Sequence, residues 1–554
     1  MRKLLEHPLV QKAAAWVAPR RKEVGVSMAM LLVLIGPFLL KPAASTSPRH
    51  FDRRLVIMTP HPGLIRDAFG PAFAAKWRER TGQVLYIDWR VPGGTSEIAA
   101  LLKSEYTAAF QQHWQRDLGR EWSPDIAQSF LSDKSDSEAR RAFLASNIGI
   151  GVDVFFGGGS YDFESQARAG TLVAGDGEKT GLTSLMKKNP AWFTDAAIPE
   201  NVSGEPFRDP KGRWSGACIS SSGIVYNKDV LQRLGIKKEP TAWSDLADPR
   251  YFGQIALTDP AKSGSVAKVF EMLLQQEMQA AMANAAYTKL SAEGKLAQGW
   301  TNGLALIQRI AANARYFSDT STKIPLDVLR GEAAAGMCID FYGRRAQEDA
   351  GKREDGTCRI GFISPQGGTS VSVDPIGMFR GAADAELATA FIEFVLSDEG
   401  QRLWCYRAGE PGGPGAEALR RLSVRRDFYT PENLKHMSDA DEMPFEKAKS
   451  FTYRPELTAA AFSSIRFLVR VLCVDPHEEL KAAWQAIHSH SKPAERALIV
   501  MQDLSRVPYD SATGSIRATL SSRDKIQEAR LARQLSDTFR NQYEKALQMA
   551  LRGE

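Results

Sequence analysis

The chain has 554 residues, of which 43% are hydrophobic and 25% are charged, a composition typical of globular proteins rather than of disordered or fibrous ones. This length exceeds what one hydrophobic core supports, so two or three domains are expected. The formal net charge is +6, and residues 1–45 carry +5 of it through seven Lys or Arg against two Glu. The rest of the chain is close to neutral, which argues against nucleic acid as a partner.

A leader segment is predicted at the N-terminus. Residues 24–40 form an uncharged apolar run directly after the basic residues 20–22. A run of this length fits either a short transmembrane helix or a secretory signal core. The basic flank predicts that residues 1–23 stay in the cytoplasm while the remainder crosses the membrane. The small residues 43–45 offer a cleavage site, so the body is expected in the periplasm, released or tethered to the inner membrane by an uncleaved helix. A buried core helix is the alternative reading of this run.

Strand and helix patterns alternate in the next part of the chain. Residues 55–60 predict a strand, and 63–80 predict an amphipathic helix in which Phe69, Phe73 and Trp77 recur every four residues. A second strand is expected at 84–89, then a helix after the glycines 93 and 94, and a third strand at 151–159 that runs into a glycine loop. This alternation predicts a mainly parallel sheet in an α/β fold.

A further series of strands and helices begins at residue 218. Strands are expected at 218–227, 254–260, 333–343, 359–365 and 372–379, with helices after 263, at 304–312 and at 386–395. Beyond the proline- and glycine-rich break at 411–415 the chain is predicted to be mostly helical. The charge spacing of its last part, 521–551, predicts a solvated helix that packs on the body.

Several segments, in this order, carry a resemblance to a known family: LVIMTPHPGLIRDAFGPAF, DVFFGGGSYDFESQARAG, GIVYNKDVLQRLGI, PTAWSDLADPRYFGQIALTDPAKSGS and DPIGMFRGAADAELATAFIEFVLSDEGQRLW. They span about residues 53–405. The chain resembles the type II periplasmic solute-binding proteins of bacterial ABC importers. More narrowly it is similar to the branch that binds ferric iron, 2-aminoethylphosphonate, sugar phosphates, thiamine and polyamines.

The resemblance implies an α/β fold of two lobes joined by two crossing hinge strands, one near 223–227 and the other near 372–375. The expected organisation is lobe 1 mainly in 53–217, lobe 2 mainly in 218–371, a return to lobe 1 in 372–420, and a helical C-terminal extension in 421–554. The family does not catalyse a reaction and needs no cofactor. Its members close over a small solute by hinge motion and deliver it to an ABC transporter permease. A monomer is expected, touching the membrane only through its N-terminal helix.

Four loops that follow strands or open helices are expected to face the cleft, because ligands in open α/β sheets bind beyond the carboxyl ends of the strands. The hinge region adds serine hydroxyls, of which at most two can face the ligand. The candidate ligand-binding residues are Thr59, His61, Gly158, Gly159, Ser221, Ser222, Ser263, Gly264, Ser265, Asp340 and Tyr342.

Each of these loops also has an ordinary structural explanation. The glycines 157–159 offer free backbone amides for an anion, or they form a flexible turn. The serines around Gly264 place hydroxyls and amides at a helix N-terminus, or Ser263 is only an N-cap. His61 donates to an anion, ligates a metal or is a plain surface histidine. These groups predict an anionic or zwitterionic solute of the phosphonate or sugar-phosphate kind.

Asp340 and Tyr342 are expected at the end of a buried strand. Asp340 would bind an amine of the solute or anchor the hinge. In ferric-binding members two adjacent tyrosines occupy this place, and here the first of them is Phe341. The glutamate that completes the ferric site is also missing after the strand ending at Gly157. No metal is therefore expected, and only His61 and Tyr342 would remain as ligands if the solute were iron.

Two further points were open from the residues alone. The chain has five cysteines and no CxxC motif. Cys338 and Cys358 lie on consecutive predicted strands, so either a disulfide joins them or both are buried thiols. An exported hydrolase is a competing function, although GxSxG, HExxH and Walker A patterns do not occur. A sensor that uses the same two-lobed fold is another.

Overall fold

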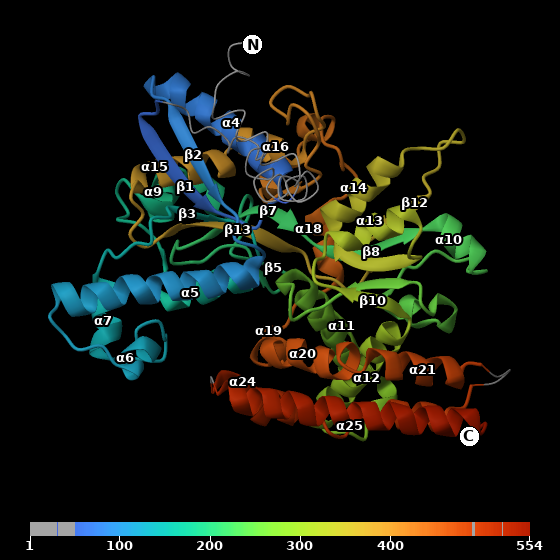
Figure 1. Ribbon diagram of the computed structural model, residues 1–554. Coiled ribbons are helices and arrows are strands. Elements are labelled where there is room, and N and C mark those ends of the chain that lie inside the picture. The colour runs from blue at the N-terminus through green and yellow to red at the C-terminus, as the bar shows by residue number, and fades with distance from the viewer. Residues whose placement is uncertain (1–29, 31–49, 490–492, 523) are drawn as a thin grey trace, which may run out of the picture. The chain divides into compact units, whose positions relative to one another are not determined.

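The computed structural model describes residue 30 and residues 50–489, 493–522 and 524–554 (Figure 1). The expected cytoplasmic segment 1–23 and the membrane or signal helix 24–40 lie outside the described residues, apart from Met30.

A seven-stranded sheet forms the centre of what we call the first lobe. Its order is β14-β7-β13-β3-β1-β2, with β4 paired to β13. β1 runs parallel to β3, with Ile57 opposite Val154, whereas β13 is antiparallel to β3 and β7. The strands are β1 (Arg53–Met58), β2 (Leu85–Arg90), β3 (Val154–Phe156), β4 (Leu172–Val173), β7 (Ser215–Ser220), β13 (Ser372–Phe379) and β14 (Leu422–Ser423).

Helices of this lobe bury aromatic side chains against its sheet. Phe69, Phe73 and Trp77 of α4 are all buried, as their four-residue spacing predicted. Phe69 packs against Trp404 with ring centroids 4.4 Å apart. The helices are α4 (Gly63–Thr81), α5 (Thr95–Gln112), α6 (Pro124–Ser129), α7 (Glu138–Ala145), α8 (Ser160–Ala169), α9 (Gly181–Lys188), α15 (Ala385–Leu396) and α16 (Asp398–Cys405).

A five-stranded sheet forms the centre of the second lobe. Its order is β10-β9-β11-β8-β12, in which β9 is parallel to β10 and β11 and β8 is antiparallel to both of its neighbours. The strands are β8 (Ser222–Asn227), β9 (Ile255–Thr258), β10 (Ala314–Ser318), β11 (Ala335–Ile339) and β12 (Ile360–Ile363). The helices are α10 (Lys228–Arg233), α11 (Gly264–Ala283), α12 (Ala292–Ala312), α13 (Lys323–Arg330) and α14 (Asp340–Ala350). A separate two-stranded ribbon pairs β5 (Asn201–Val202) with β6 (Glu205–Pro206).

The chain passes between the two sheets at neighbouring points. It leaves the first sheet at Ser220, enters the second at Ser222, and returns after Ile363 to begin β13 at Ser372. Ser220 and Ser372 face each other in the ladder between β7 and β13. The two connections therefore run side by side, near the positions that the family resemblance implied for the hinge strands.

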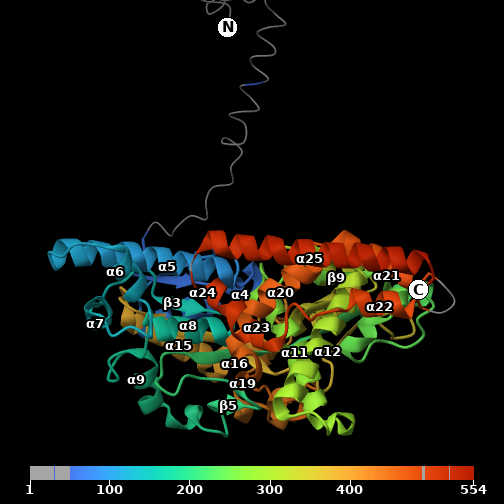
Figure 2. The same ribbon diagram turned by 90° about the horizontal axis from the view of Figure 1, so that it is seen from below.

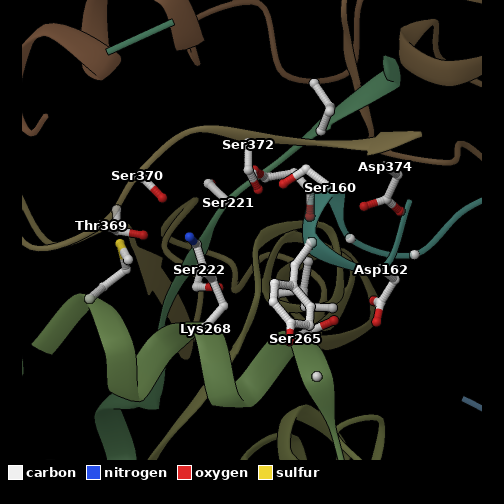
Figure 3. Close-up of a pocket in the computed structure, with 18 of the residues that line it drawn as sticks. Ser160, Asp162, Ser221, Ser222, Ser265, Lys268, Thr369, Ser370, Ser372 and Asp374 are labelled. Carbon is white, nitrogen blue, oxygen red and sulfur yellow. Dashed lines mark hydrogen bonds between the residues drawn. The ribbon is translucent and has the colours of Figure 1, made fainter. Parts of the chain in front are cut away.

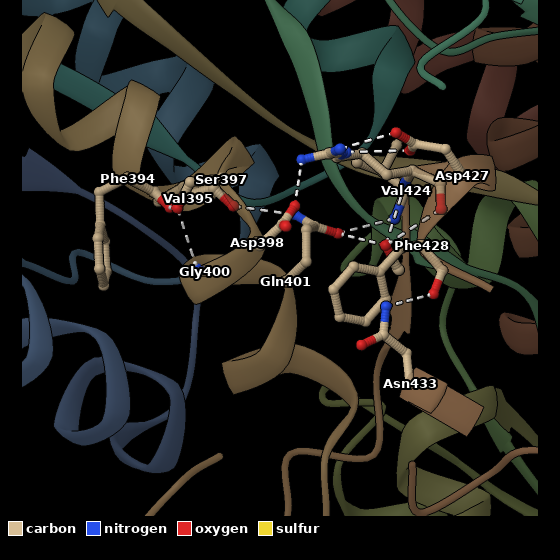
Figure 4. A network of polar contacts seen from close by, with 12 residues as sticks. Phe394, Val395, Ser397, Asp398, Gly400, Gln401, Val424, Asp427, Phe428 and Asn433 are labelled. Carbon is tan, nitrogen blue, oxygen red and sulfur yellow. Dashed lines mark hydrogen bonds and ion pairs between the residues drawn. The ribbon is translucent and has the colours of Figure 1, made fainter. Parts of the chain in front are cut away.

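The return to the first sheet runs beyond residue 420. β14 pairs with β7, Leu422 opposite Ile219, so the expected helical extension from 421 begins with a strand. A polar network fixes this strand (Figure 4). The Gln401 amide donates to the carbonyl oxygens of Ala217 and Val395, and its oxygen accepts from the Ser423 hydroxyl at 2.7 Å.

The remaining residues, 424–554, form what we call the C-terminal segment. Trp300 of α12 donates to the carbonyl oxygen of Val507, and Gln308 donates to the Tyr543 hydroxyl at 2.7 Å. Buried side chains of α11, α12, the second sheet and this segment make one hydrophobic cluster. Its helices are α17 (Pro431–Leu434), α18 (Pro444–Lys447), α19 (Pro455–Thr458), α20 (Phe462–Val469), α21 (His477–Ile487), α22 (Glu495–Met501), α23 (Tyr509–Thr513), α24 (Ser515–Ser521) and α25 (Lys525–Leu551).

The long helix α25 lies along α21 and α22, and buries Phe539 and Tyr543 while its charged face stays exposed (Figure 2). Among the described residues, the helical stretch Pro455–Val474 alone is long and apolar enough to cross a membrane by length and composition. The structure buries 67% of its most apolar window, as expected for a core helix of a folded protein.

The structure corrects one local expectation and decides between two alternatives left open by the sequence. β11 ends at Ile339, so Asp340 and Tyr342 lie in the first turn of α14 and not at the end of a strand. Cys338 and Cys358 are both free thiols. Cys338 pairs with Gly223 on one side of β8, whereas the strand that follows Cys358 pairs on the other side. A disulfide between them is excluded here because β8 separates the two strands.

Candidate functional site

Two adjoining cavities lie where strand ends of the two sheets meet. We call the first the serine cavity; it has an empty volume of about 770 Å³, including space open to solvent. The second, of about 1120 Å³ on the same measure, is the histidine cavity. Gly158, Gly264, Ser265, Ile339 and Asp374 line both, so the two are parts of one cleft.

The serine cavity takes its walls from both lobes and from the C-terminal segment (Figure 3). The first lobe contributes the start of α8, with Asp162, and the hinge strand β13. The second lobe contributes Ser222 and the first turns of α11, with Lys268. The C-terminal segment contributes Phe462 and Arg466 of α20.

The N-terminus of α11 is the point where the two cavities join. Ser263 is its N-cap, and the Ser263 hydroxyl accepts from the Val266 amide at 3.4 Å. A Cβ atom at Gly264 would lie 2.9 Å from the Thr95 hydroxyl oxygen of the first lobe. Glycine at this position therefore lets the two lobes approach closely. A helix of this length presents unpaired amides and a positive dipole end to the cleft, which favours an anionic group there.

His61, Asp374 and Arg421 form a charged group at the floor of the histidine cavity. One Asp374 oxygen lies 2.8 Å from Arg421 Nη2 and 3.5 Å from His61 Nε2. Burial alone would raise the pKa of the Asp374 carboxyl, but Arg421 and His61 hold this pKa below its usual range. Burial lowers the pKa of His61, an effect that Asp374 only partly opposes, so His61 is neutral near pH 7.

Arg421 keeps hydrogen-bond donors available to a solute. Its guanidinium lies 3.7 Å from the centre of the Phe341 ring and is almost fully buried. Its Nε and Nη1 atoms have no hydrogen-bond partner among the described residues. Buried donors without partners are costly, and an anionic group of a bound solute would satisfy them.

Lys268 projects into the serine cavity beside two buried carboxylates. Its Nζ lies 3.1 Å from Glu205 Oε1 and 3.1 Å from Glu271 Oε2, and 3.4 Å from the Tyr453 ring centre. Burial alone would lower the pKa of Lys268, but the two glutamates hold it above its ordinary value. Figure 3 shows the ammonium directed toward Ser221 and Ser222. Because two carboxylates face one ammonium, this wall does not add net positive charge to the cleft.

Asp162 is the carboxylate of the serine cavity whose burial is least offset by neighbouring groups. Burial raises its pKa to about 6, although the Thr95 hydroxyl and the charge of Arg466 oppose the shift. The carboxyl lies in the first turn of α8, close to the N-terminus of α11. A charged group of a bound solute would therefore change the protonation state of Asp162.

Most of the residues expected from the sequence lie at this cleft. Ser221, Ser222 and Gly159 line the serine cavity, and Gly158, Gly264 and Ser265 line both cavities. His61, Ser263 and Tyr342 line the histidine cavity.

Thr59 and Asp340 do not line either cavity, which corrects two of the expectations. The Thr59 hydroxyl accepts from the His61 amide at 3.0 Å and so shapes the loop that carries the histidine. Asp340 is fully buried, pairs with Arg344 at 2.7 Å and accepts from the Phe341 amide. Its partners within α14 make it a structural anchor.

Sequence reasoning missed the charged residues Asp162, Lys268, Asp374, Arg421 and Arg466. Asp374 lies in the segment already assigned to a hinge strand, and Lys268 lies one turn beyond Ser265. Both could therefore have been found from neighbouring residues that were predicted to face the cleft. Arg421 lies beyond the main resemblance, which ends at about residue 405, and Arg466 lies in the part from Thr452 onward, where the likeness to the family indicated no site residue.

Comparison with known proteins finds a family model that matches the central part of the chain. Residues 189–423 match the family of bacterial extracellular solute-binding proteins. The resemblance expected from the sequence is thereby confirmed over that part of the chain.

Individual relatives are distant. An uncharacterized protein of Haemophilus influenzae is 27% identical over 283 residues, 50% of this chain and 68% of that one. The phosphoglycerate transport regulatory protein PgtC of Salmonella typhimurium is 24% identical over 317 residues, 55% of this chain and 66% of its own length. A putrescine/cadaverine-binding protein of Pseudomonas aeruginosa is 28% identical over 250 residues, 44% of this chain and 65% of its own length. The chain thus spans about two thirds of these relatives' length.

Among solved structures, the chain is similar to the periplasmic binding protein AfuA of Actinobacillus pleuropneumoniae, crystallised with fructose 6-phosphate. The identity is 18%, the TM-score is 0.45, and the match covers 75% of this chain and 99% of that one.

Proposed function

We propose that this protein is the extracytoplasmic solute-binding component of an ABC importer, which captures a small solute by closing its two lobes. The observation that carries the proposal is the cleft itself. Its walls come from both sheets, and the two connections between those sheets run side by side at Ser220 and Ser372. Two adjacent connections allow one lobe to rotate against the other, which is the geometry of hinge closure.

The charges of the cleft favour a solute with little net charge. The lining side chains comprise four cations, Lys262, Lys268, Arg421 and Arg466, and four carboxylates, Glu97, Asp162, Asp319 and Asp374. Arg421 and the start of α11 form a place for an anionic group, whereas Asp162 and the carboxylates behind Lys268 oppose further negative charge. A zwitterionic or singly charged organic solute, such as an aminophosphonate or a monoanionic sugar phosphate, fits this balance better than a free dianion.

Ferric iron is less well supported as the solute. Tyr342 has no second tyrosine beside it among the described residues that line the histidine cavity, because its neighbour is Phe341, whose ring offers no oxygen to a metal. The described residues contain no cluster of three or more His, Cys, Asp or Glu side chains arranged to hold a metal ion.

An exported hydrolase also lacks support from this cleft. His61 Nε2 faces Asp374 at 3.5 Å, and neither ring nitrogen bonds to a serine among the described residues, so the histidine has no nucleophile to activate here.

A thermal-shift screen tests the proposal. The probes are 2-aminoethylphosphonate, fructose 6-phosphate, 3-phosphoglycerate, putrescine and ferric citrate. A compound that binds the folded protein at a hundred times its Kd stabilises it by about 2.7 kcal/mol. We expect 2-aminoethylphosphonate to raise Tm most, because it carries a positive and a negative group, and putrescine and ferric citrate not to raise it.

A pair of variants locates the binding group within the cleft. Arg421→Lys keeps a charge beside Asp374 but loses the guanidinium donors, so it should weaken binding by about 1–3 kcal/mol. Arg426→Lys, five residues further and exposed, is the matched control and should bind like the wild type. Stabilisation by putrescine or iron alone, or by none of the probes, would contradict the proposed solute class.

A further inference from the structure

Helix α20 belongs to the C-terminal segment and yet forms part of the cleft wall. Phe462 and Arg466, one turn apart, both line the serine cavity. Side chains four residues apart share one face of a helix. One face of α20 is thus turned to the cleft, although the helix lies beyond the region that matches the solute-binding family.

Other side chains of α20 are built into the second lobe. Ile465, Leu468 and Val469 are buried in the hydrophobic cluster that includes α11, α12 and the second sheet. Arg466 Nε and Nη2 donate to the carbonyl oxygens of Pro260 and Ala261, each at 2.9 Å, in the loop just before α11. These contacts tie α20 to the second lobe, so the two should move as one body.

Across the cleft, the same two side chains of α20 contact the first lobe. Arg466 Nη2 also donates to the Ser96 hydroxyl of α5 at 3.1 Å. The Phe462 ring lies 4.7 Å from the ring of Tyr161 in α8. The Arg466 charge also acts on Asp162, the carboxylate next to Tyr161. If the lobes separated, these contacts would break, whereas those to Pro260 and Ala261 would remain.

We infer that α20 is a closing element of the cleft: Arg466 and Phe462 bind the first lobe when the lobes come together and seal one end of the solute cavity. The inference builds on the proposed function, since it assigns to residues outside the matched family region a part in holding the solute site shut. It also gives the C-terminal segment a role at the site. The solute must fit between this end and the Arg421 end of the cleft.

Spin-label distance measurements on the protein without added solute test this inference. Nitroxides at Glu105→Cys in α5 and Ala297→Cys in α12, both exposed positions, report the separation of the lobes. Cys358→Ser removes the one native thiol that is not buried. We expect the wild type to show a short-distance population, and Arg466→Ala to reduce that population about two- to tenfold, the effect of one lost hydrogen bond.

Two further variants keep the test decisive. Ser96→Ala removes the same bond from the first lobe without touching the packing of α20, so it should shift the distances in the same direction. Arg470→Ala is the matched control, because Arg470 follows on the next turn, is half exposed and pairs with Asp475 of the same segment. The inference is overturned if both Arg466→Ala and Ser96→Ala keep the wild-type distances, if the wild type shows no short-distance population, or if Arg470→Ala shifts equally.

The distance measurements test the role of α20 and the thermal-shift screen tests solute binding, so either hypothesis can be refuted without the other. Unchanged distances in the variants would remove the role of α20 while leaving solute binding as the function. Absence of any stabilising solute, with distances that still depend on Arg466, would do the reverse.

Discussion

Asp162 and Asp374 are both carboxylates of the cleft, but their surroundings have opposite effects on their ionisation. Arg421 and His61 hold Asp374 in its charged form in spite of burial. Asp162 has a hydroxyl and a more distant arginine, so burial prevails and its pKa rises to about 6. A carboxyl whose pKa is higher in the folded protein than in the unfolded chain destabilises the fold as the pH rises.

The first prediction concerns Asp162→Asn. Between its ordinary pKa of 3.8 and about 6, the folded protein binds a proton at Asp162 that the unfolded chain releases. Stability from this group is therefore present at pH 4 and is lost by pH 7. One pKa unit corresponds to about 1.4 kcal/mol, so we expect the variant to be more stable than the wild type by about 1–3 kcal/mol at pH 7.5. Urea unfolding at pH 3.5 and 7.5 measures this difference, which should be small at the lower pH. If the variant and the wild type differed in stability by the same amount at both pH values, the pKa of Asp162 would not be raised in the folded protein.

Candidate binding residues could be predicted from the sequence where they follow a strand or begin a helix. His61 and the serines around Gly264 were found because they follow a strand or begin a helix. Asp162 and Lys268 lie within one turn of such residues, but only their tertiary surroundings show that they face the cavity. For Asp340 the anchoring role was one of two alternatives, but its partner was not predictable, because Asp340 was expected at the end of a strand and lies instead in α14, one turn before Arg344.

At the level of elements, two nearby serines at the start of α11 have different roles, one in capping the helix and one in lining the cleft. The Ser263 hydroxyl caps the helix, and Ser265 lines both cavities. The simple N-cap explanation for Ser263 is therefore correct, and it does not prevent the same turn from holding an anionic group. The two serines should respond differently to substitution.

The second prediction separates these tasks. Ser263→Ala should lower the free energy of unfolding of the solute-free protein by about 1 kcal/mol, because an N-cap bond is lost. Ser265→Ala should leave that stability nearly unchanged and weaken solute binding by about 1–3 kcal/mol. Chemical denaturation and isothermal titration with the solute found by the thermal screen measure the two effects. Equal solute affinity in Ser265→Ala and wild type would remove this turn from the site.

Strands and long amphipathic helices were predicted well because their periodic patterns are local. The helix at 63–80 matches α4 to within one residue at its end, and the last helix matches α25 apart from its first turn. The short strand β14 and the position of α20 in the cleft were not predicted. β14 has only two residues, and its place depends on Gln401, twenty-two positions away, and on pairing with β7.

For the molecule as a whole, the helices α19 to α25 of the C-terminal segment are part of the second lobe rather than an addition to it, whereas Arg425 at the start of the segment pairs with Asp398 of the first lobe. The Trp484 indole donates to the Asn313 side chain at 2.8 Å, and the Tyr543 hydroxyl joins Gln308 to the carbonyl oxygen of Leu472. Removing the segment would expose the apolar face of α12, including Trp300 and Leu304. Exposed apolar patches of that kind favour aggregation.

The third prediction follows from this shared core. A chain that ends at residue 424 should lose cooperative unfolding and bind the dye ANS, because its second lobe lacks half of its hydrophobic packing. Near-ultraviolet circular dichroism and thermal unfolding would show this. The control is Arg533→Ala on the exposed face of α25, which should unfold like the wild type. A truncated chain with a sharp thermal transition would show that the second lobe folds without the segment.

The five free cysteines have a consequence for how the protein is made and handled. Cys218, Cys338, Cys405 and Cys473 are buried, and burial raises the pKa of each thiol above its ordinary value. Protonated, enclosed thiols react slowly with oxidants and alkylating reagents. We therefore expect a reducing agent to leave the thermal stability of the purified protein unchanged.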